Sequence, residues 1–529
     1  MPDPVKLEVF KNKFVSVTEE MGYCLNRTAF SANIKERRDF SCALFDSSAR
    51  MVSQAAHIPV HLGSMPMSVK SAITELELEP EDMVMLNDPF GGGTHLPDIT
   101  LVAPVCTDEG EIVALVANRA HHADIGGMSP GSMPLATSIY QEGLIIPPVK
   151  VVRSGAIDQD LMNVILKNVR TPSEREGDLY AQISANLTGI KRFTELIESS
   201  GRQTIVDYMG YLNDYSESFM RKAIQRIPDG RYDFEDFMDD DGFSSNPIRL
   251  AVSVCIDGDQ ATLDFSDSAD QVKGNINAPA SITRSAVMYV FRCLIPESVP
   301  TNDGCMKPVN IITRKGSILD PLEGAAVAGG NVETSQRIVD VVLGALSRAL
   351  PHCIPAASQG TMNNVTIGGI DPLNGERFSY YETIGGGTGA SASGRGEDAI
   401  HSHMTNTLNT PIEALEFSFP LRVERYSVRR GSGGQGYYRG GDGMVRVLKV
   451  LCDADVAVLS ERRVLPPYGL FGGKSAKTGK NTVCRQGTEH TMPGKFSTTL
   501  ESGDTLIIES PGGGGYGRSE TDNMQQKKG

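Results

Sequence analysis

Long apolar runs are missing from this sequence. No window reaches the roughly 18 uninterrupted apolar residues that a membrane-spanning helix needs. The first residues carry charge throughout and lack the apolar core of about 7 to 15 residues that marks a secretory signal peptide. We therefore expect a cytoplasmic protein with no membrane partner.

Cysteine pairs are missing as well. The nine cysteines are scattered without a single CxxC spacing, and most of them stand within apolar runs, as Cys255 does. This pattern is typical of reduced, buried thiols in a cytosolic protein rather than of a disulfide framework.

The sequence has no excess of positive charge. Fifty basic residues stand against 65 acidic ones, which gives a formal net charge of −15. The short basic clusters at Lys35, Arg37 and Arg38 and at Arg462 and Arg463 are interrupted by acids and are typical of a solvated or salt-bridged surface. A nucleic-acid partner is not expected.

A complete phosphate-binding loop is also absent. Gly473, Lys474 and Ser475 resemble the end of a Walker A loop, but the position that should hold its first glycine is Tyr468. The glycine runs at residues 385–389 and 512–515 fit either close backbone approach to a substrate or tight β-turns. The sequence therefore predicts no self-contained ATP site.

What is present is an ordinary globular composition with two kinds of periodicity. Hydrophobic residues make up 40% and charged residues 22% of the chain. Apolar steps of three and four predict helices at residues 7–28, within 157–227, at 281–294 and at 334–350. Short apolar runs predict strands at residues 42–45, 51–52, 83–86, 99–105, 112–117, 248–256 and 261–265.

These elements predict an α+β fold arranged in consecutive regions. We expect an N-terminal α+β metal-site region (1–155), a helical region (156–245), a second α+β region (246–420), a β-rich C-terminal region (421–517) and a polar tail (518–529).

Histidines are concentrated near the N-terminus. Five of the nine lie between residues 57 and 122: His57, His61, His95, His121 and His122. His95 and Asp98 are three residues apart after a run of glycines that permits tight turns. If residues 99–105 and 112–117 form a hairpin, antiparallel pairing brings Asp98 next to residues 119–122.

Imidazole and carboxylate ligands together suit one divalent transition metal, either Mn, Zn or Fe. The alternative is that these histidines are hydrogen-bonded structural residues, which is the usual role of a lone histidine. The whole cluster favours the metal. His57 and His61 fit ligation and a supporting or substrate-facing role equally well.

Several groupings carry a resemblance to the hydantoinase B/oxoprolinase family over nearly the whole chain. The most specific stretch is residues 87–131, which holds several rare groupings in order. The stretches that resemble the family are residues 38–41, 57–66, 87–98, 118–134, 140–148, 330–340, 403–411 and 511–517.

The resemblance implies a metal site and a partner. The family's metal ligands map onto Asp39, His95, Asp98 and either His121 or His122, with His121 slightly favoured; Asp39 is supplied by the resemblance alone. The implied partner is a hydantoinase A-type ATPase subunit that carries ATP and Mg and begins phosphoryl transfer. We expect a hetero-tetramer.

The expected activity is ATP-dependent hydrolysis of a small cyclic amide, such as a lactam, a hydantoin or 5-oxoproline. A metal could generate hydroxide near neutral pH and act as a Lewis acid. Candidate helpers are Glu142 as base, Arg119 as phosphate clamp, and His57, His61 and Asn118. The alternatives are a subunit of an ATP-dependent ketone carboxylase of the acetone or acetophenone type, and a non-catalytic scaffold subunit.

The missing phosphate loop yields a first prediction. The purified chain alone should neither bind ATP in the micromolar range nor turn over a lactam, because no complete loop is present to hold the phosphates. Titration calorimetry of the isolated chain with ATP measures this directly. Tight ATP binding by this chain alone would contradict the expected division of labour.

Overall fold

The computed structural model describes residues 3–55 and 58–519, so His57 and residues 520–529 of the expected polar tail lie outside the described part. The chain opens with helix α1 (Pro4–Thr28), which begins where the Asp3 side chain accepts a hydrogen bond from the backbone of Val5. Its buried stripe includes Phe10 and Phe14, as the periodicity predicted. The fold is mixed α+β, which confirms the expected class.

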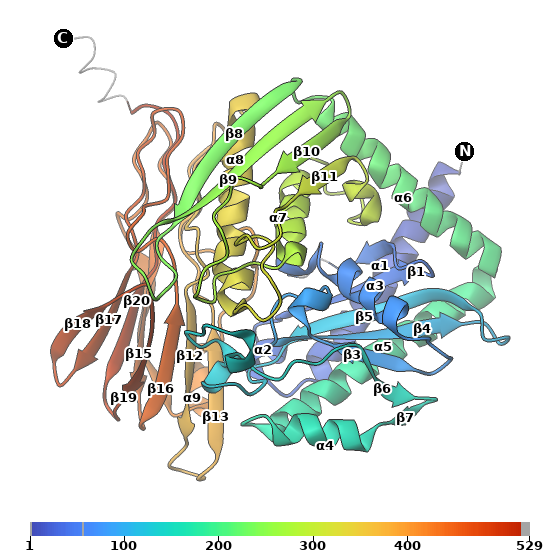
Figure 1. Ribbon diagram of the computed structural model, residues 1–529, viewed down its shortest axis with the longest axis horizontal. Coiled ribbons are helices and arrows are strands. Elements are labelled where there is room, and N and C mark those ends of the chain that lie inside the picture. The colour runs from blue at the N-terminus through green and yellow to red at the C-terminus, as the bar shows by residue number, and fades with distance from the viewer. Residues whose placement is uncertain (1–2, 56–57, 520–529) are drawn as a thin grey trace.

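A seven-stranded antiparallel sheet forms the N-terminal part (Figure 1). Its strand order is β2-β1-β5-β4-β3-β6-β7. Side chains on its two faces belong to two different cores: Cys42 and Leu44 pack with α1 and α5, whereas Ala43 and Phe45 pack with the centre of the chain. The strands are β1 (Phe40–Asp46), β2 (Met51–Gln54), β3 (Met83–Leu86), β4 (Asp98–Cys106), β5 (Ile112–His121), β6 (Val149–Arg153) and β7 (Ala156–Ile157).

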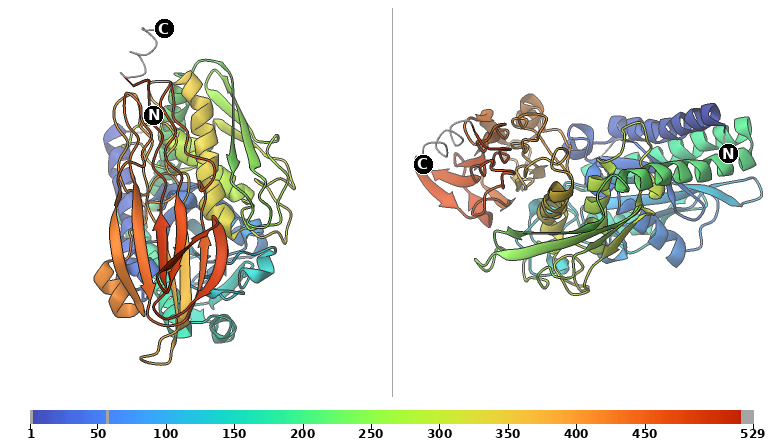
Figure 2. Two further views of the ribbon diagram at one scale, coloured as in Figure 1. Left: turned by 90° about the vertical axis from the view of Figure 1, so that its left-hand side faces the viewer. Right: turned by 90° about the horizontal axis from the view of Figure 1, so that it is seen from above.

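Helices cover this sheet. The long helices α5 and α6 follow the sheet in the chain, and together with α4 they confirm the helical block predicted after residue 157. Figure 2 shows α5 and α6 beside α1, at the end of the molecule opposite the C-terminal strands. The helices of this half are α2 (Ala32–Lys35), α3 (Met65–Glu75), α4 (Gln159–Lys167), α5 (Pro172–Ser200) and α6 (Arg202–Ile224).

The centre of the chain holds a four-stranded sheet of order β11-β10-β9-β8. The β9–β10 hairpin confirms the prediction for residues 248–265. Helix α8 packs on β8 and β9, where Gly344 leaves room for the ring of Phe234. The elements are β8 (Gly230–Met238), β9 (Ile248–Asp257), β10 (Gln260–Asp264), α7 (Ala280–Arg292), β11 (Val309–Ile312), the π-helix η6 (Gly330–Thr334) and α8 (Ser335–Ala349).

Two further sheets share a third core at the C-terminal end. Their orders are β13-β12-β16-β19 and β14-β15-β20-β17-β18. The first sheet joins strands from both sides of residue 420, where we expected the second α+β region to end. The domain boundaries remain a proposal. The elements are β12 (Asn364–Ile370), β13 (Arg377–Glu382), α9 (Ile412–Ser418), β14 (Leu421–Arg429), β15 (Gly443–Val450), β16 (Ala454–Leu459), β17 (Lys480–Arg485), β18 (Thr488–Met492), β19 (Lys495–Leu500) and β20 (Thr505–Glu509).

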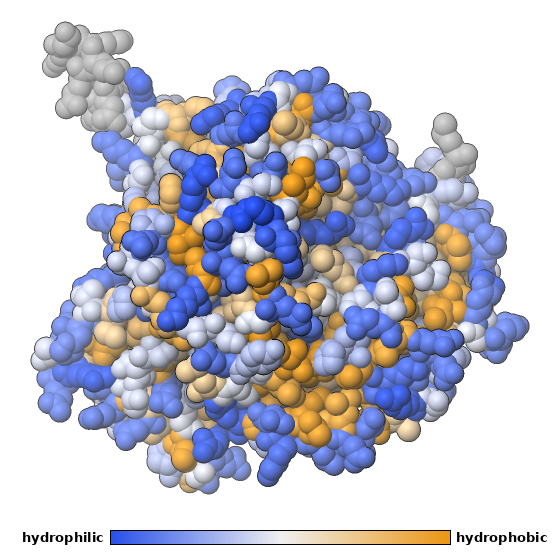
Figure 3. Space-filling view, viewed as in Figure 1, coloured by the Kyte–Doolittle hydropathy of each residue, from blue (hydrophilic) through white to orange (hydrophobic). Residues whose placement is uncertain are grey.

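The helices are short or polar relative to the thickness of a membrane. No helix within the described ranges is long and apolar enough to cross a bilayer. On the face drawn in Figure 3, hydrophilic residues surround separate apolar patches.

The expectation that the cysteines are buried is wrong in part. All nine are free, but Cys255, Cys293 and Cys353 are exposed. Cys255 lies on β9, where side chains alternate between the core and solvent, so an apolar neighbourhood in the sequence does not place it inside.

The glycine runs near the C-terminus pack against one another. A Cβ on Gly513 would lie 1.9 Å from the carbonyl oxygen of Thr388, and a Cβ on Gly387 would lie 2.0 Å from that of Gly441. The amide of Gly513 donates to the carbonyl of Gly441 at 2.9 Å. These glycines therefore allow backbone segments to approach each other closely.

A buried ion pair joins the two C-terminal sheets and yields a stability prediction. Glu382 on β13 accepts two hydrogen bonds of 3.1 Å from Arg446 on β15, and neither side chain is exposed. Glu382→Gln should destabilise the fold by about 3–5 kcal/mol, because it leaves the Arg446 charge buried without its partner. Denaturant unfolding of the whole chain measures the loss.

The matched control is the pair between Arg231 and Asp233, whose side chains are 64% and 59% exposed. Asp233→Asn should leave the unfolding midpoint unchanged, because solvent screens this pair. Equal effects of the two substitutions would show that the buried pair has no special role.

Candidate metal centre

The register of three neighbouring strands brings three candidate residues to one end of the large sheet. Asp98, the first residue of β4, pairs directly with His121, the last residue of β5. The amide of His121 donates to the carbonyl oxygen of Asp39, which precedes β1, at 3.0 Å. The predicted hairpin and the approach of Asp98 to residues 119–122 are confirmed.

The turn before β4 delivers His95 to the same place. Gly92 has a φ of 95°, and a Cβ there would lie 2.6 Å from the carbonyl carbon of Met67, so the turn needs glycine. The side chain of Asn87 then donates to the carbonyl of Leu96 at 2.8 Å and holds the loop closed.

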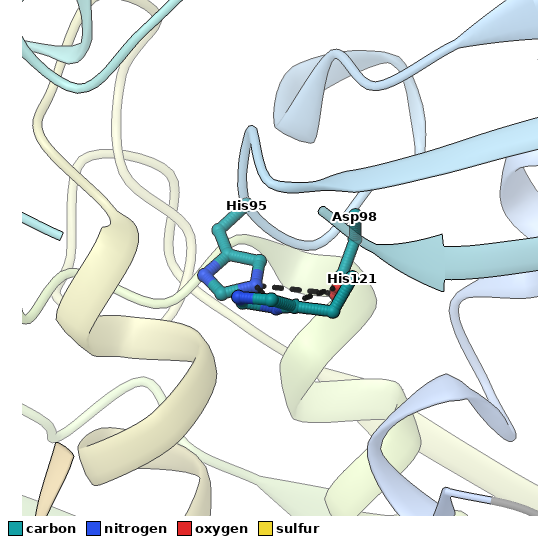
Figure 4. Close-up of side chains that lie close together, drawn as sticks. All are labelled: His95, Asp98 and His121. Atoms are coloured by element: carbon teal, nitrogen blue, oxygen red, sulfur yellow. Dashed lines mark hydrogen bonds and ion pairs between the residues drawn. The ribbon is translucent and has the colours of Figure 1, made fainter. Parts of the chain in front are cut away.

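His95, Asp98 and His121 point toward one another (Figure 4). The Asp98 carboxylate lies 3.3 Å from His95 Nε2 and 3.2 Å from His121 Nδ1, and these two nitrogens are 3.2 Å apart. Thr94 donates its hydroxyl to Asp98 Oδ2 at 2.5 Å. All three candidate ligands are buried.

His61 joins this group from the 3-10 helix η1 (Pro59–His61). Its Nε2 lies 3.4 Å from Asp98 Oδ2, and its Nδ1 makes a 2.8 Å hydrogen bond with the hydroxyl of Ser41. Three imidazoles therefore face one carboxylate.

Electrostatics hold Asp98 in its ionised form. Burial alone would raise the pKa of Asp98, but the charges of His95 and His61 and the hydrogen bonds from His121 and His61 keep it well below its ordinary value. Burial lowers the pKa of His121, which favours its neutral form. An ionised carboxylate beside neutral imidazole is the protonation state that metal binding requires.

The donor set fits one metal ion. Two ligand atoms about 2.1 Å from a tetrahedral ion lie about 3.4 Å from each other. The distances of 3.2 to 3.3 Å among His95, Asp98 and His121 match this spacing. One carboxylate and two imidazoles are compatible with Mn, Zn or Fe.

A small cavity of about 20 Å³ adjoins the cluster. Asp39 lies on its wall beside His61, Asp98 and His121, while the guanidinium of Arg37 is 3.9 Å from the Asp39 carboxylate. Asp39 is thus at the cavity but outside the tight group of three.

The opposite wall comes from distant segments that no local pattern places there. The ring of Tyr381 stacks on that of His121, with centroids 4.5 Å apart. The Tyr381 hydroxyl donates to Asn364 at 2.9 Å, and Asn364 donates to the buried Glu333 at 2.7 Å. Glu333 and the cavity-lining Asn331 both lie in the π-helix η6, a rare element that is frequent at functional sites.

His122 and Asn118 face helix α5. His122 Nε2 makes a 2.9 Å hydrogen bond with Gln182, and Asn118 bonds both Gln182 and Asn186. Burial, helped by the charge of Arg175, lowers the pKa of His122 to about 4. The structure thus places His121 with the cluster and turns His122 toward the helix.

Arg119 is completely buried and fastens the start of α3 to the sheet. It donates to the hydroxyls of Thr100, Ser64 and Ser68 at 2.6 to 2.8 Å. Burial lowers its pKa to about 10, against the opposing charge of Asp98. A role as phosphate clamp stays a prediction. The contact with Ser64 connects Arg119 to His61 indirectly, because the Ser64 hydroxyl donates to the carbonyl of His61 at 3.3 Å.

Glu142 supports the opposite wall. Its carboxylate accepts hydrogen bonds from the amides of Val327 and Ala328 at 2.9 and 3.0 Å, just before η6. Burial raises the pKa of Glu142 to about 8, although both amides oppose the shift. A role as base stays a prediction; its contacts act on the segment that leads to Asn331.

Comparisons with known proteins cover the whole chain. The 5-oxoprolinase of Dictyostelium discoideum is 42% identical over 535 residues, which cover 98% of this chain and 41% of that protein. The chain thus spans about two fifths of the length of such curated relatives. A putative D-/L-hydantoinase subunit of Pseudomonas sp. (strain NS671) is 30% identical over 97% of this chain and 90% of its own length.

A solved structure has the same fold. The ATP-dependent caprolactamase from Pseudomonas jessenii matches with a TM-score of 0.91 and 29% identity, over all of this chain and 94% of that one. The hydantoinase B/oxoprolinase family matches residues 3–519. The chain belongs to the hydantoinase B/oxoprolinase family.

Proposed function

We propose that this chain is the metal-binding component of an ATP-dependent enzyme that hydrolyses a cyclic amide. The observation that carries the proposal is the buried Asp98 carboxylate facing His61, His95 and His121 in a chain whose relatives include 5-oxoprolinases. The names of those relatives suggest the substrate class: a lactam, a hydantoin or 5-oxoproline.

His95, Asp98 and His121 would hold the metal, with Asp39 from the cavity wall as a further ligand. A bound metal would supply a Lewis acid and hydroxide near neutral pH. The chain's own residues shape the reaction space. Tyr381 covers the face of the His121 ring and narrows the cavity, which limits access of bulk water to the reacting atoms.

His61 can position a proton at the site. Its Nδ1 is fixed by the hydroxyl of Ser41, so its Nε2 points at Asp98. An imidazole held in one orientation beside a carboxylate can accept a proton from an attacking water and pass it on.

ATP and Mg would belong to a partner, a hydantoinase A-type ATPase. A stable amide needs activation, and phosphorylation of its oxygen provides a leaving group. Two relatives support this division: a 5-oxoprolinase more than twice as long as this chain, and a hydantoinase subunit of nearly its own length. We propose a cytoplasmic hetero-tetramer of the two subunits.

Metal content tests the site without any activity assay. The purified chain should carry close to one transition-metal ion, and His121→Asn should lose it, because this change removes a ligand nitrogen. His122→Asn is the matched control and should retain the metal, since His122 bonds Gln182 instead. Elemental analysis decides, and metal loss in His122→Asn alone would reverse the assignment of the pair.

Ring opening by the reconstituted complex tests catalysis. His95→Ala and Asp98→Asn should each remove several kcal/mol of transition-state stabilisation. The rate should therefore fall on the order of a thousandfold or more. Nucleotide binding by the partner should be unchanged. The measurement is the steady-state rate per folded complex, beside size-exclusion chromatography.

The same variants separate the rival functions. A scaffold role predicts insoluble or dissociated subunits, with activity lost only in proportion to the protein lost. A ketone carboxylase would consume acetone or acetophenone with bicarbonate and leave lactams intact. Folded, metal-free complexes that hydrolyse lactam at the wild-type rate would refute a catalytic metal.

A further inference from the structure

The cavity beside the candidate metal centre is too small for the substrate. Its volume of about 20 Å³ accommodates little more than one water molecule, which needs about 10–15 Å³. Pockets that bind small molecules usually measure about 300–1,000 Å³. The body of a cyclic amide must therefore lie outside this cavity.

A larger pocket of about 330 Å³ lies next to it. Three chain segments contribute to both spaces. Ile58 lines both spaces. In the segment before β1, Asp39 lines the small cavity, whereas its neighbours Arg38 and Phe40 line the large pocket. The segment at residues 404–408 also lines both spaces. The two spaces thus share one wall, and the large pocket has the volume that a small ring requires.

Arg38 is the feature of this pocket that points to a ligand. It is an exposed arginine with a φ of 55°, a left-handed conformation that is costly for residues with a side chain. No described residue forms a hydrogen bond or ion pair with its guanidinium. The neighbouring Arg37, by contrast, is buried and donates to Asn33 and Thr383.

The rest of the lining suits a small polar ring. Tyr23, which is 70% exposed, offers an aromatic surface, and Glu19 from α1 offers an acceptor for an amide N–H. Glu19 and Arg38 are the charged residues among the described lining. One cation and one anion in the lining of the same pocket favour a ligand that carries both an oxyanion and an N–H donor.

We propose that this outer pocket binds the cyclic amide and that the Arg38 guanidinium holds an oxyanion of that substrate. The inference rests on the proposed function and specifies its substrate class. The oxyanion has two sources: a carboxylate on the ring, as in 5-oxoproline, or the phosphoryl group that the partner places on the amide oxygen.

Binding to the full chain as purified, whatever its metal content, tests the proposal without the partner. The probes are 5-oxoproline, 2-pyrrolidinone, which lacks the carboxylate, and inorganic phosphate, each titrated by calorimetry or ligand-observed NMR. Arg38→Leu should weaken binding of the anionic probe about 10- to 100-fold, the range for hydrogen bonds to charged groups. Arg38→Lys, which keeps the charge, should recover part of the loss.

The matched control is Arg27→Leu, which removes an exposed arginine from the last turn of α1 outside the pocket and should bind all probes like the wild type. A loss confined to 5-oxoproline assigns Arg38 to a ring carboxylate. A loss confined to phosphate, with both lactams unaffected, assigns it to the phosphoryl group.

Two results would overturn the proposal: a wild-type chain that binds neither anionic probe, or an Arg38→Leu variant that binds both as tightly as the wild type. Neither depends on ring opening. If Arg38 proves not to bind the oxyanion, the prediction of metal content still stands. If the purified chain carries no metal, binding that depends on Arg38 can still be measured.

Discussion

One buried carboxylate sets the requirements for the rest of the site. An ionised Asp98 out of contact with water is costly unless several donors compensate it. The donors are the hydroxyl of Thr94 and the rings of three histidines. Thr94 and His95 lie in the turn before β4, His121 lies at the end of β5, and His61 lies in the 3-10 helix η1. The strand register, the glycine turn and the hydrogen bond from Arg119 to Ser64, which follows η1, all contribute to this convergence.

Much of the surrounding structure contacts the site only through other residues. Glu142 binds the backbone just before η6, and η6 supplies Asn331 to the cavity wall. Asn118 attaches β5 to helix α5 near the strand end that presents His121. Groups that look catalytic by residue type therefore include several whose visible contacts position other segments.

Local patterns in the sequence account for many of the elements and for part of the site. Periodicity predicted α1, the strands around Asp98 and the β9–β10 hairpin, because each depends on neighbours within a few residues. The predicted hairpin then brought Asp98 to residues 119–122, and the strand register of the structure selects His121 among them. Tyr381 and Asn331 could not be found this way, since nothing local indicates which distant segment closes the cavity. Burial of Cys255 was predicted wrongly for a related reason: composition does not show which face of a strand is covered.

The stacking of Tyr381 on His121 has a consequence for how the centre forms during synthesis. The ligands emerge from the ribosome first, and Tyr381 follows roughly 260 residues later. At about 5–20 residues per second, the open half-site would exist for a time on the order of tens of seconds. An ion captured in that interval would meet ligands still open to solvent, and the later arrival of the C-terminal strands would enclose it. If the proposed site binds a metal, the order of residues along the chain would thus leave a period for metal selection that ends when folding is complete.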